Sequence, residues 1–263
     1  MMLHNKVAVI YGAGGAIGSA VARAFALEGA RLFLTGRQRA SVEAVARDVL
    51  SAGGSAEAAE VDALDERAID RHLQAAIDNA GRIDIAFNAV GIPGSKILGV
   101  PLVELDVEQF ALPIATYATS YFLIARLAAR RMVANRSGVI ITATTQHSRM
   151  GIPLSGGYGP AMAAEEALTR VLSAELAPHG IRVVGLRPQA IPESGTLKEA
   201  FEARASVSAM TWEQFQESLA SKTHSRRLMT LEELANVAVF MASDKASGMT
   251  GTTVNLTMGC LDD

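Results

Sequence analysis

A short apolar run near the start of the chain leads directly into a glycine-rich turn. Residues 7–11 read VAVIY, and the turn after them carries Gly12, Gly14, Gly15 and Gly18 before a helical pattern begins. Backbone amides at a helix N-terminus point outward as donors, and glycines let a phosphate approach the main chain closely. A strand, a glycine turn and a helix in this order predict a dinucleotide pyrophosphate site. A tight turn that binds nothing is the alternative.

The rest of the chain alternates short β-branched runs with longer helical patterns. Continuous apolar runs without alternation are typical of strands buried on both faces. The predicted strands are residues 7–11, 31–34, 58–61, 83–88, 139–142, 182–186 and 253–256. The predicted helices lie near residues 17–28, 39–52, 65–80, 108–133, 159–177 and 231–242. This order predicts an α/β fold: a Rossmann-like, doubly wound parallel sheet of about seven strands with helices on both faces, forming a single domain over residues 1–263.

Two long connections interrupt this alternation, at residues 92–105 and 190–229. Both follow strands, so they are expected over the carboxyl edge of the sheet, where open α/β sheets bind ligands. The second connection contains a polar, helical pattern at residues 211–221 that includes Trp212, the only tryptophan. We expect it to form a substrate lid. A packed helical excursion without motion is the alternative.

Composition narrows the class of partner. The net charge is −3 and lysine and arginine are scattered, so no basic stripe indicates nucleic acid binding. The single cysteine, Cys260, rules out an internal disulfide and a cysteine metal cluster, and no metal site is expected. A strand begins within a few residues of Met1, which leaves no room for a signal peptide. The apolar stretch 115–129 is interrupted by Ser120 and Arg126, so no membrane span is expected and the prediction is a cytoplasmic protein.

The residues after the second predicted strand bear on the choice of dinucleotide. An acid here would accept a hydrogen bond from the ribose 2′-hydroxyl and indicate NAD(H), but the strand ends at Leu34 and is followed by Gly36 and Arg37. Arginine can bind a phosphate bidentately. NADP(H) is therefore favoured over NAD(H). A solvated charge at a helix start is the alternative for Arg37.

Over nearly its whole length the chain resembles the short-chain dehydrogenase/reductase family. The family's TGxxxGxG turn is similar to residues 11–18, with Tyr11 for threonine and Ala16 for the middle glycine. The family's NNAG is similar to residues 88–91, which read NAVG, and residues 176–188 and 227–251 are similarly typical. The resemblance implies that Asp62 contacts the adenine. The cofactor-binding residues that it and the glycine turn together imply are Gly12, Gly14, Gly15, Ile17, Gly18, Arg37, Asp62, Ala63, Asn88, Ala89, Gly91, Tyr158 and Pro188.

The family's chemistry uses asparagine, serine, tyrosine and lysine, and the resemblance implies an altered set here. Tyr158 matches the tyrosine that donates a proton to the carbonyl oxygen, and Thr145 stands at the serine position. Met162 replaces the lysine, and Thr116 and Tyr117 lie near the asparagine position. A thioether has neither charge nor donor, so Tyr158 is expected to be a weaker acid. Reduction should suffer less than oxidation, because a protonated tyrosine can still donate.

Three further residues bear on whether another side chain replaces the missing lysine or binds the substrate. His147 lies two residues after Thr145 and can donate protons near neutral pH, so it is a catalytic candidate; a histidine that only lines the pocket is the alternative. Arg149 is a candidate for an anionic substrate group. Glu165, on the same predicted helix face as Tyr158, is expected to carry a negative charge and so cannot replace the lysine.

A further departure follows the sixth predicted strand. Gln189 replaces the glycine of the family's Pro-Gly and is expected to crowd the nicotinamide. Glu193 or Ser194 occupies the region where a family threonine meets the nicotinamide amide. The adenine half of the site therefore resembles the family closely, and the nicotinamide half is changed.

Three functions follow from these observations. The first is an NADP(H)-dependent oxidoreductase with an atypical active site, reducing a carbonyl, imine or activated alkene of a small-molecule substrate. The second is a catalytically silent nucleotide-binding protein, and the third is non-redox chemistry in the same pocket. The alanine-rich stretches 115–129 and 161–177 match helices that pair across subunits in the resembled family, which implies a homodimer or homotetramer. Packing of both helices against the sheet alone is the alternative.

Overall fold

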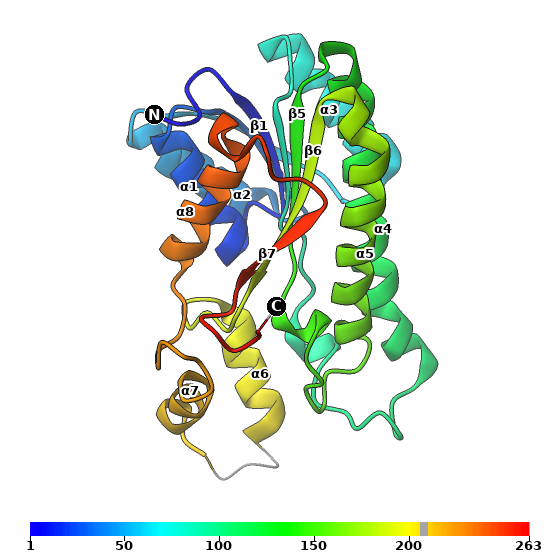
Figure 1. The fold of residues 1–263 in the computed structure, drawn as a ribbon, viewed down its shortest axis with the longest axis vertical. Helices are drawn as coiled ribbons and strands as arrows, with labels where there is room; N and C mark the ends of the chain where they lie inside the picture. The colour runs from blue at the N-terminus through cyan, green and yellow to red at the C-terminus, as the bar shows by residue number, and fades with distance from the viewer. Residues whose placement is uncertain (206–209, 263) are drawn as a thin grey trace.

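The computed structural model describes residues 1–205 and 210–262. Within these residues a parallel sheet of seven strands runs through the middle of the molecule (Figure 1). Its strands are β1 Val7–Tyr11, β2 Arg31–Gly36, β3 Ser55–Glu60, β4 Ile85–Asn88, β5 Gly138–Ala143, β6 Ile181–Pro188 and β7 Thr252–Leu256. Their order across the sheet is β3-β2-β1-β4-β5-β6-β7, with every neighbouring pair parallel. This confirms the predicted fold class and puts the reversal of strand order between β1 and β4, where such sheets bind ligands.

Helices cover both faces of the sheet (Figure 1). One face carries α1 Ala16–Leu27, α2 Arg39–Ser51 and α8 Leu231–Ala242, and the other carries α3 Glu66–Ala80, α4 Val107–Met132 and α5 Tyr158–Leu176. Each face has its own apolar core. In β1 the alternation of side chains sends Ala8 and Ile10 into one core and Val9 and Tyr11 into the other. The continuous apolar runs of the sequence arise because both faces are covered.

Short polar residues set where several helices begin. The side chain of Asp65 caps α3 by accepting from the backbone amides of Arg67 and Ala68, so α3 begins one residue later than predicted. Thr230 and Glu233 form a capping box at the start of α8. Short 3₁₀ turns complete the chain: η1 Gly94–Lys96, η2 Val133–Asn135, η3 Gln146–Ser148, η4 Ala177–His179 and η5 Asp244–Ala246.

Two details differ from the sequence expectation. Strand β3 spans Ser55–Glu60 rather than 58–61, and it is exposed on one face because it lies at the edge of the sheet. Helix α6, Gly195–Ala205, was not predicted. Its apolar residues do not gather on one face, so it lacks the periodic pattern that a helix packed on the sheet shows.

By length and composition alone, residues Val107–Asn135 could cross a membrane, which corrects the expectation that no such stretch exists. One such helix is weak evidence, since the core helix of a globular protein passes the same test. Here Leu123, Ile124 and Leu127 are buried in the apolar core on the face of the sheet that carries α3, α4 and α5. The apolar character of α4 is therefore accounted for by packing.

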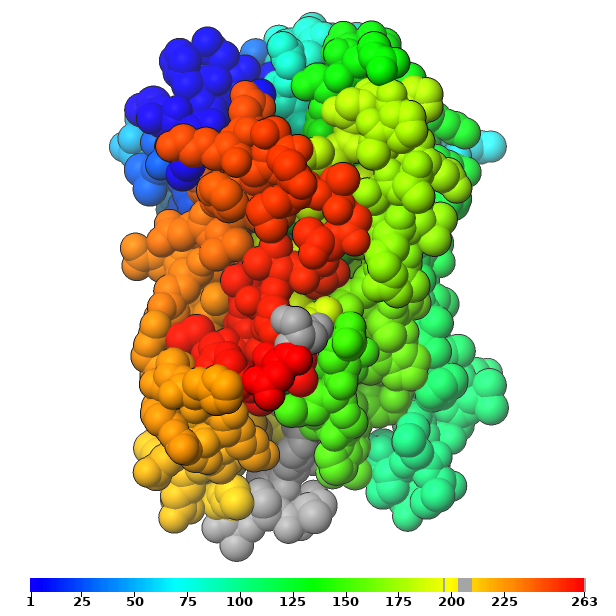
Figure 2. Space-filling view, in the orientation of Figure 1, coloured from blue at the N-terminus to red at the C-terminus, as the bar shows by residue number. Residues whose placement is uncertain are grey.

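The segment predicted as a lid contains α6 and α7, Trp212–Ala220, and residues 206–209 within it lie outside the described part. Both helices lie beyond the carboxyl ends of the strands, at the lower end of the molecule in Figure 1. In the space-filling view they sit beneath the C-terminal segment, drawn in red (Figure 2). Phe201 of α6 contacts Trp212 and Phe215 of α7 with ring centroids 5.5 Å apart in each pair. These aromatic contacts join the two helices into one unit.

Candidate active site

A cavity of about 1270 Å³ opens at the carboxyl edge of the sheet, where the strand order reverses. It is larger than the roughly 300–1,000 Å³ of an ordinary small-molecule pocket, so it has room for a dinucleotide and a second molecule. Most of the predicted site residues line it: Gly12, Gly14, Gly15, Ile17, Arg37, Asp62, Ala63, Ala89, Gly91, Thr145, His147, Tyr158 and Pro188. Two predicted residues, Gly18 and Asn88, do not belong to this lining.

The turn after β1 forms a close-fitting backbone cradle. Gly12 has a φ of 80°, and a Cβ at this position would lie 2.2 Å from the carbonyl oxygen of Ala89. Gly18 is also required, although it does not line the cavity, because a Cβ there would lie 2.3 Å from the oxygen of Gly12. No side chain caps the N-terminus of α1. Its first amides are thus available to an anion, and the cradle fits the pyrophosphate of a dinucleotide.

Tyr11, which stands where the resembled family has threonine, does not crowd this cradle. Its side chain points to the opposite face of the sheet, where its hydroxyl lies 3.0 Å from Nδ1 of His72. Burial lowers the pKa of His72 to about 4, so this histidine is neutral at physiological pH. The pair is a buried structural contact.

The end of the cavity where the sequence predicts the adenine is formed by the residues that follow β2 and β3. Arg37 and Asp62 are both exposed there, and Oδ1 of Asp62 accepts from the amide of Leu64 at 3.0 Å. Sequence reasoning missed Gln38 and Ser41, which also line this end. Their position within four residues of Arg37 was the available signal.

The three predicted catalytic residues meet at the other end. Thr145 follows β5, and its Oγ1 lies 3.1 Å from Nδ1 of His147; the donor depends on the histidine tautomer. The ring of His147 lies 4.9 Å, between centroids, from that of Tyr158 at the start of α5. The Tyr158 side chain hydrogen bonds to Thr145 and to Tyr117 of α4. Tyr117, which the sequence placed only near the asparagine position, is therefore part of the hydroxyl cluster, and its own hydroxyl accepts from the amide of Ile92 at 3.1 Å.

Both tyrosines hold their protons. Burial, reinforced by the neighbouring Tyr117, raises the pKa of Tyr158 well above its usual 10. Burial also raises the pKa of Tyr117 to about 12. Met162 lines the cavity beside Tyr158 and is 1% exposed, so it brings no opposing charge. At neutral pH the cluster is thus protonated and holds no phenolate that could accept a proton, although the raised pKa makes each tyrosine a weaker acid.

The surroundings of Glu165 oppose the negative charge that the sequence suggests. This side chain is fully buried, and its Oε1 accepts from Nδ2 of Asn88 at 3.2 Å and from Oγ1 of Thr142 at 3.5 Å. Burial raises the pKa of the Glu165 carboxyl well above its usual value, which favours the neutral form. The Asn88 side chain hydrogen bonds to this buried carboxyl and does not line the cavity. It therefore supports the cavity wall from the protein interior.

A buried ion pair beside the site was missed by sequence reasoning. Nε and one terminal nitrogen of Arg187 donate to the two oxygens of Glu166 at 2.7 and 2.8 Å, and both side chains are 3% exposed. Glu166 also accepts from the hydroxyls of Thr144 at 3.2 Å and Ser148 at 2.5 Å. These two residues flank Thr145 and His147. An arginine in the apolar strand β6 was the only sequence signal.

The remaining candidates are divided by the structure. Gln189 and Ser194 line the cavity. Gln189 is buried and its Nε2 donates to the carbonyl of Leu219 in α7 at 3.4 Å, so it joins the end of β6 to α7. Arg149 and Glu193 are exposed and do not line the cavity. Among the described residues no group of three or more His, Cys, Asp or Glu could hold a metal ion.

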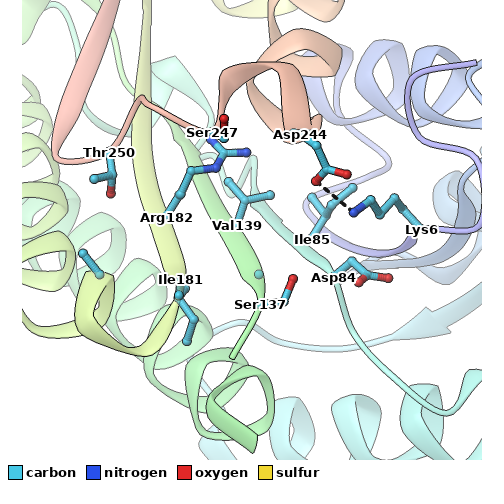
Figure 3. A pocket seen from close by; sticks show the side chains of 14 residues that line it. Lys6, Asp84, Ile85, Ser137, Val139, Ile181, Arg182, Asp244, Ser247 and Thr250 are labelled. Atoms are coloured by element: carbon cyan, nitrogen blue, oxygen red, sulfur yellow. Dashed lines mark hydrogen bonds and ion pairs between the residues drawn. The ribbon is translucent and has the colours of Figure 1, made fainter. Parts of the chain in front are cut away.

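A second, smaller cavity of about 340 Å³ lies at the opposite, amino edge of the sheet (Figure 3). Its Lys6 and Asp244 form an ion pair at 3.0 Å. Its Arg182 donates to the carbonyls of Met241 and Ser243 at 2.8 and 3.0 Å. These charged groups hold neighbouring segments together, and the cavity lies away from the hydroxyl cluster.

This fold, with a glycine cradle and a tyrosine-centred hydroxyl cluster in one cavity, defines a dinucleotide-binding oxidoreductase of the Rossmann type. Residues 12–260 match the family profile described as enoyl-(acyl carrier protein) reductase. The chain belongs to the short-chain dehydrogenase/reductase family, whose fold binds NAD(P).

Relatives and solved structures agree with this assignment. The chain is 31% identical to the uncharacterized oxidoreductase YxbG of Bacillus subtilis, covering 98% of this chain and 92% of that one. It is 29% identical to 7alpha-hydroxysteroid dehydrogenase of Escherichia coli, covering 98% and 95%. The structure of NAD⁺-bound xylitol dehydrogenase superposes with a TM-score of 0.90 at 25% identity, covering 97% and 98%.

Proposed function

We propose that this protein is an NADP(H)-dependent reductase that reduces a carbonyl group, or a related imine or activated alkene, in a small molecule. The observation that carries the proposal is the protonated Tyr158, held in a hydroxyl cluster in the same cavity as the glycine cradle. The proteins similar to this chain include dehydrogenases with the same fold. The fold therefore favours neither oxidation nor reduction, and the proposed direction is supported by the site alone.

The proposed chemistry assigns one task to each residue. A nicotinamide dinucleotide held at the glycine cradle would supply a hydride, that is, a proton with two electrons, to the carbonyl carbon. Tyr158 donates its proton to the carbonyl oxygen, so the products are the alcohol and the oxidised cofactor. Thr145 holds that oxygen, and His147, hydrogen bonded to Thr145, is placed to return a proton to the cluster. The opposite direction would need Tyr158 as a base, which its raised pKa disfavours.

The dinucleotide preference is proposed from Arg37, which lines the adenine end where no acid stands on β2. Replacing Arg37 with alanine should raise the Kd for NADPH about tenfold or more, because a charge-assisted hydrogen bond contributes about 1.5–3 kcal/mol. The Kd for NADH should change less than about twofold. Fluorescence titration measures both constants. Arg47→Ala, at an exposed arginine of α2 outside the cavity, is the control. Equal losses for the two dinucleotides would contradict the NADP(H) proposal.

The exchange of lysine for methionine is proposed to be coupled to Glu165. Residues three apart on a helix are neighbours, and Oε2 of Glu165 is a buried oxygen without a hydrogen-bond partner among the described residues. In Met162→Lys the new ammonium should take the proton's place on Glu165 and form a buried pair with it. Reductase activity should therefore change less than about threefold in Met162→Lys, and should be about tenfold higher in Met162→Lys with Glu165→Leu. Steady-state kinetics of both variants and of Glu165→Leu test this. Additive effects would contradict the coupling.

We also propose that residues 1–263 form one domain and that the protein is cytoplasmic. A homodimer or homotetramer is supported by apolar side chains left exposed on α4 and α5, namely Phe110, Leu112, Phe122 and Val171, and light scattering tests it. If NADPH binds but no substrate is turned over, a silent nucleotide-binding protein is favoured. If a substrate is converted without change in the cofactor, non-redox chemistry is favoured.

A further inference from the structure

The part of the cavity around the hydroxyl cluster is walled by apolar side chains from three separate segments. They are Ile92 and Leu98 after β4, Ile152 and Leu154 after β5, and Leu197 and Phe215 of the lid helices. Apolar walls favour substrates that remove apolar surface from water, and they offer no hydrogen-bond partners to a polyol.

The charged side chains from these segments do not serve a buried anion. Within the described lining, the loops and the lid contribute three of them: Lys96, Lys222 and Glu199. The two lysines are exposed at the rim. Glu199 accepts from the amide of Gly94, and a Cβ on Gly94 would lie 2.8 Å from Oε2 of Glu199. The Glu199 carboxylate thus joins α6 to the loop after β4.

Leu154 is held in this wall against the preference of its own backbone. Its φ is 62°, in the left-handed region that bulky side chains rarely adopt. Its carbonyl accepts from the amide of Gly99 at 2.9 Å, which ties the loop after β5 to the loop after β4. Backbone strain of this kind persists where the surroundings fix it, and it is concentrated at ligand sites. The strained turn places a leucine where asparagine or glycine would be easier to accommodate.

We propose that the site takes a bulky, apolar ketone or aldehyde with no acidic group close to its carbonyl, and that Leu154 sets this preference. The inference rests on the proposed reductase function for the reaction, and on the wall alone for the class of molecule. Small polyols and sugars would leave much of this apolar wall without contact.

The decisive variant is Leu154→Asn. Asparagine has a similar size, tolerates positive φ and is polar, so the substitution changes the wall and relieves the strain without removing the turn. For cyclodecanone, kcat/KM should fall about tenfold or more, whereas for dihydroxyacetone it should change less than about twofold. Leu50→Asn, at an exposed leucine of α2 outside the cavity, is the matched control and should change neither value.

A binding measurement separates this inference from the reductase function. Trp212 stacks on Phe215, which lines the cavity, with ring centroids 6.2 Å apart. Fluorescence of this single tryptophan, recorded with saturating NADP⁺, should change saturably with cyclodecanone and not with dihydroxyacetone at the same concentrations. Cyclodecanone binding that weakens in Leu154→Asn, without any NADPH oxidation, would uphold the ligand class and reject the reductase. Binding of neither ketone, preference for dihydroxyacetone, or an unchanged preference in Leu154→Asn would overturn the inference.

Discussion

Tyr158→Phe should lower the reductive kcat by about 10²–10⁴-fold, the usual contribution of a positioned general acid. The phenylalanine keeps the ring against His147 and Tyr117 and removes only the hydroxyl that donates the proton. Because most of the proposed cofactor-binding residues lie elsewhere in the cavity and the ring at position 158 is kept, the Kd for NADPH should change by less than about threefold. Single-turnover NADPH oxidation and fluorescence titration measure the two effects separately.

The matched control for this variant is Tyr121→Phe. Tyr121 is also fully buried, and its hydroxyl makes a hydrogen bond of 3.0 Å with Thr169, away from the cavity. The same atom is removed, and stability should fall by about 1 kcal/mol, but the rate should stay within about twofold. If Tyr158→Phe kept most of the wild-type rate, the proton would have to come from another group, and His147 would be tested next.

The raised pKa of Tyr158 also gives a pH dependence with a definite sign. The protonated form donates in reduction, so reductive activity is present below the folded-state pKa and is lost as the pH rises through it. Because burial raises that pKa well above 10, titration of Tyr158 should not limit a reductive rate measured between roughly pH 6 and 9. A reductive rate that falls with an apparent pKa near 7 would indicate a different titrating group.

The parts of this site that the sequence predicts are those set by local backbone chemistry. Gly12 is required by a carbonyl oxygen that a Cβ would strike, and such a turn is recognisable from a few consecutive residues. The strands are recognisable because burial on both faces leaves continuous apolar runs. The sequence also places Met162 beside Tyr158, because residues one helical turn apart lie on the same face of α5.

What the sequence does not predict depends on which elements lie side by side. The charge of Glu165 is set by burial against β4 and β5, where Asn88 and Thr142 meet it. Arg187 and Glu166 are 21 residues apart and meet only because the end of β6 lies beside α5. In the same way, no local pattern shows that Arg149 lies outside the cavity or that Gln189 hydrogen bonds to Leu219 of α7.

The Glu166–Arg187 pair leads to the largest expected effect on stability. Glu166→Leu leaves the guanidinium of Arg187 buried at 3% exposure without the Glu166 carboxylate, and should lower the free energy of unfolding by about 3–5 kcal/mol. Glu166→Leu combined with Arg187→Met removes both charges and should return to within about 1 kcal/mol of the wild type, because buried pairs are often replaced by apolar residues at no net cost. Urea denaturation measures both. Glu43→Leu, which breaks the exposed pair with Arg39, is the control and should leave the urea midpoint close to that of the wild type.

The double variant also separates stability from the arrangement of the site. Without the Glu166 carboxylate, the hydroxyls of Thr144 and Ser148 lose their acceptor on either side of Thr145 and His147. A protein as stable as the wild type but with kcat lowered about tenfold would show that the pair orders the loop that carries Thr145. If activity returned together with stability, the loop would be positioned by its own backbone, in particular by the amides of Ser148 and Arg149, which donate to the carbonyls of Thr145 and Gln146. The pair would then serve only to neutralise an arginine that β6 buries, and the methionine and leucine would serve equally well.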